Sequence, residues 1–174
     1  FRGLLRGTRF GRNSDSSLRE TFEELIEQHE ENEPPVDPVA RAMLDKVLTV
    51  GALTVSDVMV PRADITAVDV SIERNEILKL LVEESHSRMP VYRGNLDDVL
   101  GMIHIKDILA SIVAEEPFDT QELLRKILFV APSMRVLDLL LQMRQDRIHM
   151  ALVVDEYGGI DGLTTIEDLV EQIV

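Results

Sequence analysis

MPVYRGNLDDVLGMIHIKDIL (residues 89–109) and MALVVDEYGGIDGLTTIEDLV (residues 150–170) can be laid over each other without a gap at a constant offset of 61. Most apolar positions stay apolar, and four positions are identical: Met89/Met150, Gly101/Gly162, Ile105/Ile166 and Asp107/Asp168. Upstream the match continues with a slip of one residue, where Ser71-Ile72 pairs with Ser133-Met134. A tandem repeat of about 60 residues is longer than a solenoid unit and short for an independent domain. We therefore expect two copies packed about a pseudo-two-fold axis, with a ligand cleft between them.

The composition predicts a compact protein with an aliphatic core. Of the 174 residues, 45% are hydrophobic but only 4% are aromatic. The chain has no Cys, which excludes disulfides, thiolate metal sites and a cysteine nucleophile and fits a reducing compartment. A chain of this length forms one unit, or two small halves that share a core.

The charge of the chain limits its partners. It has 32 acidic residues against 18 basic ones, a formal net charge of −14. Such a surface repels phosphate backbones, so we expect no nucleic-acid partner. No apolar run approaches the ~20 residues that span a bilayer, and no signal peptide is present. Because the sequence begins at Phe1 and stops within a helical pattern at Val174, we expect it to be a fragment.

Residues 1–37 are expected to form a flexible basic tail and then an acidic helix. Residues 1–19 carry five Arg and one acid, Asp15. Two interpretations stay open for them: a disordered tail, or a basic arm that contacts anionic lipid or an acidic partner. Residues 20–37 hold eight acids and no Lys or Arg, which predicts a solvated helix that ends by Pro34-Pro35.

Residues 38–53 are predicted to form a lead-in helix. The apolar residues between Val39 and Leu48 follow the i, i+3, i+4, i+7 spacing of one helical face. After it, Thr54-Val55-Ser56-Asp57 is a capping box that opens a short helix, which Pro61 ends.

Residues 54–114 and 115–174 are the two copies of one pattern. In the first we expect a strand at Ile65–Val70, a helix from Ser71, strands at Met89–Tyr92 and Val99–Ile103, and a helix with Ile105, Ile108, Leu109, Ile112 and Val113 on one side. In the second we expect a helical lead-in at Gln121–Leu128, a strand at Phe129–Ala131, a helix from Ser133, strands at Met150–Asp155 and Ile160–Thr164, and a helix from Ile166. Each copy is β-α-β-β-α, so the fold class is α/β (α+β), a small sheet covered by two helices on one side.

The most suggestive local motif is Gly162-Leu163-Thr164-Thr165-Ile166-Glu167-Asp168, where a strand ends and a helix begins. Thr165 and Asp168 have the spacing of a capping box, which many proteins without ligands contain. The same atoms can bind a nucleotide, because a helix N-terminus attracts phosphate and an Asp accepts both hydroxyls of a ribose. The first copy repeats the motif with His104 and Asp107, which favours a ligand site in the second copy and a weaker one in the first.

The two copies, each closing with Gly-x-x-(Thr/His)-x-x-Asp, resemble a tandem pair of cystathionine-β-synthase (CBS) domains, a Bateman module. Four motifs narrow the resemblance to the CorC/HlyC (hemolysin C-like) magnesium and cobalt efflux family, over about residues 38–174. They are Asp57-Val58-Met59-Val60-Pro61-Arg62, His86-Ser87-Arg88-Met89-Pro90-Val91-Tyr92, Val153-Val154-Asp155-Glu156-Tyr157-Gly158-Gly159 and Glu167-Asp168-Leu169-Val170-Glu171-Gln172-Ile173-Val174.

This resemblance implies a regulatory module that binds an adenine nucleotide, ATP with Mg²⁺ or AMP, between the copies. It implies a homodimer formed through the CBS pair, a membrane transporter domain or partner, and a cytoplasmic bacterial location at or near the inner membrane. The implied nucleotide contacts are Met59, Val60 and Pro61 for the base, Arg88 for the phosphates, Thr165 and Asp168 for ribose and phosphate, and Tyr92 beside Arg88. The weaker second site would contain His104, Asp107 and His149.

Other interpretations of these residues stay open. Val60 stands where related proteins often have Thr, which removes one hydrogen bond to the base. Arg88 can instead form a surface salt bridge, Tyr92 can be ordinary strand packing, and Met59 can belong to the core. The whole module can also be an interaction scaffold whose repeat serves to make a dimer, with a vestigial cleft.

We find no pattern in the sequence that indicates an enzyme. The four His (29, 86, 104 and 149) lack the spacing of a zinc site, so we expect no metal centre. The sequence contains no Gly-x-Ser-x-Gly, Walker A or dinucleotide fingerprint.

Overall fold

The computed structural model describes residues 37–84, 86–114 and 118–173. The predicted basic tail and acidic helix lie outside these residues. The chain divides into two compact units, residues 1–52 with 173–174 and residues 53–172. None of the helices in the described ranges combines the length and apolar character needed to cross a bilayer.

In the first unit, helix α2 (Pro38–Val50) confirms the predicted lead-in helix. Its N-cap is Asp37, whose carboxylate accepts a hydrogen bond from the Val39 N–H at 2.9 Å. Pro38 stands at the first helical position, where its missing N–H costs nothing.

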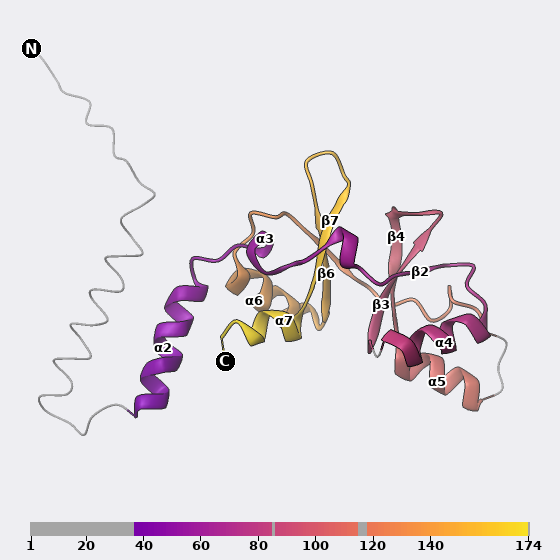
Figure 1. The fold of residues 1–174 in the computed structure, drawn as a ribbon, viewed down its shortest axis with the longest axis horizontal. Helices are drawn as coiled ribbons and strands as arrows, with labels where there is room; N and C mark the ends of the chain where they lie inside the picture. The colour runs from indigo at the N-terminus through magenta and orange to yellow at the C-terminus, as the bar shows by residue number, and fades with distance from the viewer. Residues whose placement is uncertain (1–36, 85, 115–117, 174) are drawn as a thin grey trace, which may run out of the picture. The chain divides into compact units, whose positions relative to one another are not determined.

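The second unit contains both repeats and is drawn in Figure 1. Before them lie helix α3 (Val55–Val58), strand β1 (Val60–Pro61) and the 3₁₀ turn η1 (Arg62–Asp64). The first repeat contains β2 (Val68–Asp69), α4 (Arg74–Glu84), β3 (Arg88–Arg93), β4 (Asn95–His104) and α5 (Ile105–Val113). The second contains β5 (Leu128–Val130), α6 (Val136–Asp146), β6 (Met150–Val154), β7 (Ile160–Thr165) and α7 (Ile166–Glu171). The predicted β-α-β-β-α order is therefore confirmed in both copies.

Each repeat builds its own sheet, with a parallel pair and an antiparallel hairpin. The first sheet has the order β2-β3-β4 and the second β1-β7-β6-β5. Helices α4 and α5 lie on one side of the first sheet, and α6 and α7 on one side of the second (Figure 1). This is the predicted α/β arrangement of helices covering one face.

The aliphatic core lies in layers on both sides of the strands. Between the first sheet and its helices, Val91 and Ile103 pack with Ile77 and Ile108. Successive strand residues face opposite sides, so Met102, next to Ile103, points the other way. It joins a second cluster that contains Met150, Leu152, Ile160 and Leu163 of the second repeat. The two repeats therefore pack through the helix-free faces of their sheets.

The segment that precedes each repeat in sequence packs against the other repeat. Residues before the first repeat bind the second: the Val55 N–H donates to the Met134 carbonyl at 2.8 Å, and β1 pairs with β7. Residues before the second repeat bind the first: Arg125 and Met102 exchange two backbone hydrogen bonds of 2.7 and 2.9 Å. This crossing gives residues 54–61 their place against β7 although they precede the first repeat.

The strand registers show where the two repeats correspond in space. His104 is opposite Arg88, whereas its counterpart Thr165 is opposite Met150. The loop hydrogen bonds agree, because the Ile105 N–H donates to Ser87 and the Ile166 N–H donates to His149. The first hairpin is therefore one residue longer. In space Arg88 corresponds to Met150, and not to His149 as the gap-free offset of 61 had indicated.

Several predicted boundaries were wrong because tertiary contacts hold the chain in turns. The strand predicted at Ile65–Val70 is only Val68–Asp69. The helix expected from Ser71 begins at Arg74, because the Asp69 carboxylate accepts from both the N–H and the hydroxyl of Ser71. The helix expected from Ser133 begins at Val136, because the preceding Arg135 forms a bridge with Thr54.

The predicted helical lead-in at Gln121–Leu128 is also absent from the structure. The Asp119 carboxylate accepts the Gln121 N–H at 2.8 Å, which holds a turn, and Arg125 is extended beside Met102. On α5, Leu109 and Val113 are 47% and 83% exposed and do not share the buried side with Ile108. The helical pitch rotates these two positions away from the sheet.

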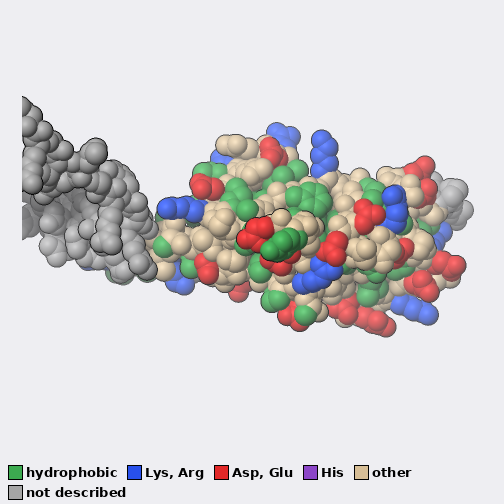
Figure 2. Space-filling view, turned by 90° about the horizontal axis from the view of Figure 1, so that it is seen from above, with side chains coloured by type: hydrophobic (Ala, Val, Ile, Leu, Met, Phe, Trp, Pro, Cys, Tyr) green, Lys and Arg blue, Asp and Glu red, His purple; other side chains and the backbone are tan. Residues whose placement is uncertain are grey.

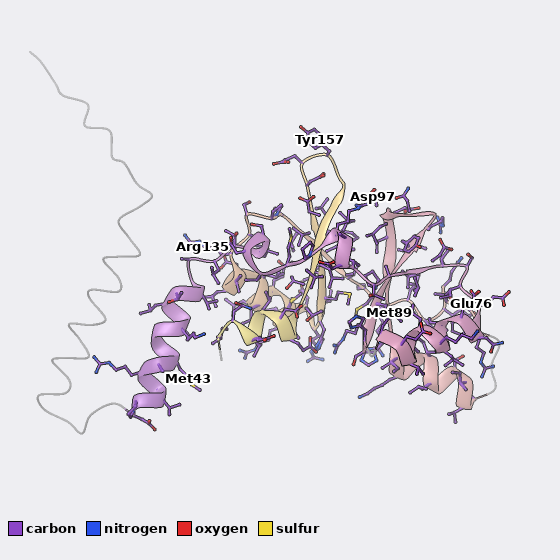
Figure 3. The ribbon with its side chains drawn as sticks, in the orientation of Figure 1. Met43, Glu76, Met89, Asp97, Arg135 and Tyr157 are labelled. Atoms are coloured by element: carbon purple, nitrogen blue, oxygen red, sulfur yellow. The ribbon has the colours of Figure 1, made fainter. Side chains whose placement is uncertain are left out.

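Charged side chains cover much of the surface. Figure 2 shows one face on which Asp and Glu side chains lie in several groups, interspersed with Lys and Arg. At the tip of the β6–β7 turn, Tyr157 points away from the strands and is 95% exposed (Figure 3).

Candidate functional site

One cavity of about 290 Å³ lies between the two repeats. This volume is at the lower end of small-molecule sites, which are about 300–1,000 Å³. Its lining residues are Val60, Asp64, Ile65, Thr66, His86, Ser87, Arg88, Pro90, Met150, Leu163, Thr165, Glu167 and Asp168. We call it the inter-repeat cavity.

The lining of the inter-repeat cavity is apolar in part and polar in part. Val60, Ile65, Pro90, Met150 and Leu163 provide an aliphatic surface. Three of them come from strands held together by the sheet: Val60 of β1 is opposite Leu163 of β7, and Met150 starts β6. An aliphatic surface of this kind suits the face of a flat ring.

Arg88 brings a guanidinium to the cavity lining. Its guanidinium Nη1 lies 2.8 Å from Oε1 of Glu167, and Nη2 lies 3.4 Å from Nδ1 of His149. The Arg88 side chain is only 17% exposed, whereas that of Glu167 is 58% exposed. The salt bridge that was the alternative interpretation of Arg88 is thus present. It joins the first repeat to the second.

The Thr165–Asp168 capping box is formed. One carboxylate oxygen of Asp168, Oδ2, accepts the Thr165 N–H at 2.7 Å and the Thr165 hydroxyl at 2.8 Å, and the Asp168 N–H donates back to that hydroxyl at 3.3 Å. These bonds hold both side chains in the cavity wall.

The N-terminus of α7 contributes less than the sequence indicated. The helix has only six residues. Its Ile166 N–H donates to the His149 carbonyl and its Asp168 N–H to the Thr165 hydroxyl, so two of the first N–H groups are already used. An anion in this cavity would therefore depend mainly on Arg88.

Of the predicted nucleotide contacts, the structure brings Val60, Arg88, Thr165 and Asp168 into the cavity lining. Met59, Pro61 and Tyr92 are not among the lining residues. Met59 packs so closely on Gly162 that a Cβ there would lie 2.5 Å from its sulfur. Tyr92 is paired with Asp69 of β2, which lies on the side of β3 opposite to β4.

Sequence reasoning missed several lining residues. Ser87 and Glu167 are adjacent in sequence to Arg88 and Asp168, within the quoted motifs. They could have been predicted as lining residues from that proximity. Asp64 ends the η1 turn, and Ile65 and Thr66, which the sequence predicted to be part of a strand, follow it. Only the crossing of this segment over the second repeat puts them beside the cavity.

The mirror site, defined by His104, Asp107 and His149, is built differently. Asp107 forms a two-pronged ion pair with Arg125, with both N···O distances 2.6 Å. His104 caps α5 by accepting the Lys106 N–H at 3.0 Å. Burial lowers the pKa of His104, and the positive charges of Arg88 and Arg125 lower it further. His149 lies against Arg88 and not with Asp107.

Among the described residues, no three His, Cys, Asp or Glu side chains are arranged to hold a metal ion. Two carboxylates of the inter-repeat cavity are instead engaged with neighbouring side chains: Glu167 with Arg88, and Asp168 with Thr165.

Comparison with known proteins identifies the family. The CBS domain family model matches residues 55–114 and again residues 122–174. A hemolysin C homolog of Rickettsia massiliae (strain Mtu5) is 45% identical over 135 residues, which are 77% of this chain and 45% of that protein. The chain thus spans about half the length of the curated relatives it matches.

Two solved structures extend the comparison. The CBS domain of a bacterial CNNM/CorC family Mg²⁺ transporter in complex with the inhibitor IGN95a has a TM-score of 0.80 at 30% identity, over 90% of this chain and 96% of that chain. The same type of domain in complex with ATP has a TM-score of 0.73 at 33% identity, over 78% of this chain and 97% of that chain. The tandem repeat and the cavity between its copies agree with these matches. The chain belongs to the CBS-domain family, as a tandem CBS module of the CorC/hemolysin C type.

Proposed function

We propose that this chain is the adenine-nucleotide-binding regulatory module of a CorC-type magnesium and cobalt efflux protein. The observation that carries the proposal is the inter-repeat cavity, where an aliphatic surface adjoins Arg88, Thr165 and Asp168. The solved relative in complex with ATP supports it. CBS domains are regulatory modules, and we propose no catalytic step.

The chemistry of the lining suggests how a nucleotide would lie. The base would contact Val60, Ile65 and Leu163, which are apolar. The phosphates would bind Arg88, because a guanidinium donates two parallel hydrogen bonds to phosphate oxygens. Thr165 donates both of its hydrogen bonds to Oδ2 of Asp168, and we propose that Oδ1 accepts a ribose hydroxyl. We propose that any Mg²⁺ enters on the phosphates.

A ligand in this position would contact both repeats at once. Arg88 belongs to the first repeat, whereas Thr165 and Asp168 belong to the second. Binding would therefore favour one arrangement of the repeats over another by its difference in affinity for the two. We propose that a membrane domain, attached or separate, reads this difference on the cytoplasmic side of a bacterial inner membrane.

Isothermal titration of the chain with ATP and with AMP, each with and without Mg²⁺, tests the proposal. We expect saturable binding of at least one nucleotide, weakened about tenfold or more in Arg88→Ala and Asp168→Asn, since one charge-assisted contact contributes about 1.5–3 kcal/mol. Arg93→Ala is the matched control, because Arg93 ends the same strand outside the cavity. No binding at millimolar nucleotide would refute the proposal.

A dimerising scaffold without a functional nucleotide site is the second candidate. It is favoured by apolar side chains on the outer sides of the helices: Val82 is 81% exposed on α4, Val113 83% on α5 and Leu141 53% on α6. A contiguous exposed apolar patch would mark an interface. Light scattering distinguishes the two candidates. The scaffold would be favoured if the chain forms a dimer equally with and without nucleotide, and if Val113→Asp dissociates that dimer.

A further inference from the structure

The crossing segments give Val60 and Arg125 the same place in their respective sheets. Val60 is opposite Leu163 in β7, and Arg125 is opposite Met102 in β4. Leu163 and Met102 correspond between the repeats, each following the repeated glycine and lying two residues before the helix cap. Arg125 is therefore the counterpart of Val60, although the distances along the sequence differ.

The two glycines provide an independent check of this correspondence. A Cβ on Gly162 would lie 2.7 Å from the Val60 carbonyl oxygen, and a Cβ on Gly101 would lie 2.6 Å from the Arg125 carbonyl oxygen. Both approaches are closer than real Cβ contacts. The same backbone contact is thus made twice, once at each end of the pseudo-symmetric module.

The side chains at these two places differ in charge and reach. Val60 lines the inter-repeat cavity together with Asp168 and leaves that carboxylate open to the cavity. Arg125 instead reaches Asp107, the counterpart of Asp168, and binds both of its oxygens at 2.6 Å. The Asp107 side chain is 26% exposed, so part of its surface is covered.

We infer that Arg125 blocks nucleotide binding at the mirror site from within: its guanidinium occupies the Asp107 carboxylate that would otherwise face a ligand. The inference rests on the proposed function. A guanidinium and a vicinal diol both donate two hydrogen bonds to one carboxylate, and the internal donor is always present at high local concentration.

Nuclear magnetic resonance of the ¹⁵N-labelled chain titrated with Mg-ATP tests the inference, because Gly162 and Gly101 report on the two sites separately. In the wild-type chain and in His104→Thr we expect the Gly162 amide to shift and Gly101 to stay in place. In His104→Thr with Arg125→Val, which restores the Thr-x-x-Asp pair and removes the guanidinium, we expect both amides to shift. Circular dichroism checks that each variant is folded.

The outcomes separate this inference from the proposed function. If the Gly162 amide resonance of the wild-type chain does not shift with Mg-ATP, both nucleotide binding and this inference are refuted. If the Gly162 amide resonance shifts in the double variant but the Gly101 resonance does not, the inference alone is refuted. A shift of the Gly101 resonance in the wild-type chain would also refute it.

A transplant of the charge gives a second test. Val60→Arg should bring a guanidinium to Asp168 and weaken ATP binding at least about tenfold more than Val60→Met, whose side chain is of similar length without charge. Equal affinities in these two variants would show that a guanidinium at this place does not close a site.

Discussion

Arg88 and Glu167 are joined across the inter-repeat cavity, with Nη1 of the first 2.8 Å from Oε1 of the second. Burial would raise the pKa of Glu167, but its own backbone N–H and the Arg88 guanidinium outweigh burial and lower it. Glu167 is therefore an internal anion that occupies the Arg88 guanidinium of the proposed phosphate site. A phosphate would have to displace it.

Glu167→Gln should accordingly raise the affinity for ATP in the absence of Mg²⁺. We expect an increase of about three- to tenfold, because the phosphate then competes with a neutral hydrogen bond in place of a charged one. Titration calorimetry measures the change. Glu171→Gln, on the same helix outside the cavity, is the control. Unchanged or lower affinity in Glu167→Gln would show that the salt bridge does not compete with the ligand.

Asp97 should make stability depend on pH in the acid range. It lies on β4 of the first repeat (Figure 3). Its carboxylate accepts hydrogen bonds from Arg62 and from the Ile160 N–H of the second repeat, and these two bonds lower its pKa to about 2. Because the unfolded value is about 3.9, the stabilisation is present above about pH 4 and is lost as pH falls towards 2.

Urea unfolding between about pH 5 and about pH 2 measures this contribution. The wild-type chain should lose stability over this window more steeply than Asp97→Asn, which has no carboxylate to protonate. Asp98→Asn, at the adjacent exposed position, controls for the loss of one negative charge. Parallel curves for the wild-type chain and Asp97→Asn would contradict the assignment.

Thr164→Val should stabilise the fold. The Thr164 hydroxyl is fully buried and is without a hydrogen-bond partner among the described residues. Leaving a buried hydroxyl unsatisfied costs about 1–3 kcal/mol, and Val has nearly the same shape. We expect a gain of about 1 kcal/mol by thermal or urea unfolding.

The neighbouring residue provides the contrast. Thr165→Val removes the hydroxyl of the capping box and should cost about 1 kcal/mol. If both variants changed stability in the same direction, the opposite roles given to these two hydroxyls would be wrong.

Gly162→Ala and Gly101→Ala should both destabilise the chain, by about 1–3 kcal/mol each, because the new methyl group meets backbone that cannot move freely. Only Gly162→Ala displaces Val60, so only this variant should also weaken ATP binding. Unfolding and titration of both variants separate the two effects. Full stability in either would show that the crossing segments are held loosely.

Much of this architecture could be predicted because it rests on local patterns. The repeat, the order of strands and helices, the aliphatic core and the Thr165–Asp168 capping box each depend on residues a few positions apart. Hydrophobic periodicity and capping chemistry act over such distances. The family motifs added Val60 and Arg88, which the structure brings into one cavity with Asp168.

Other features depended on contacts between residues distant in sequence. The partnership of Arg88 with Glu167 and the place of Arg125 opposite Met102 leave no periodic trace along the chain. They arise because the two sheets pack through their helix-free faces and exchange their lead-in segments. Local propensity therefore specified what each repeat is, and the packing of one repeat on the other decided which carboxylate stays open to a ligand.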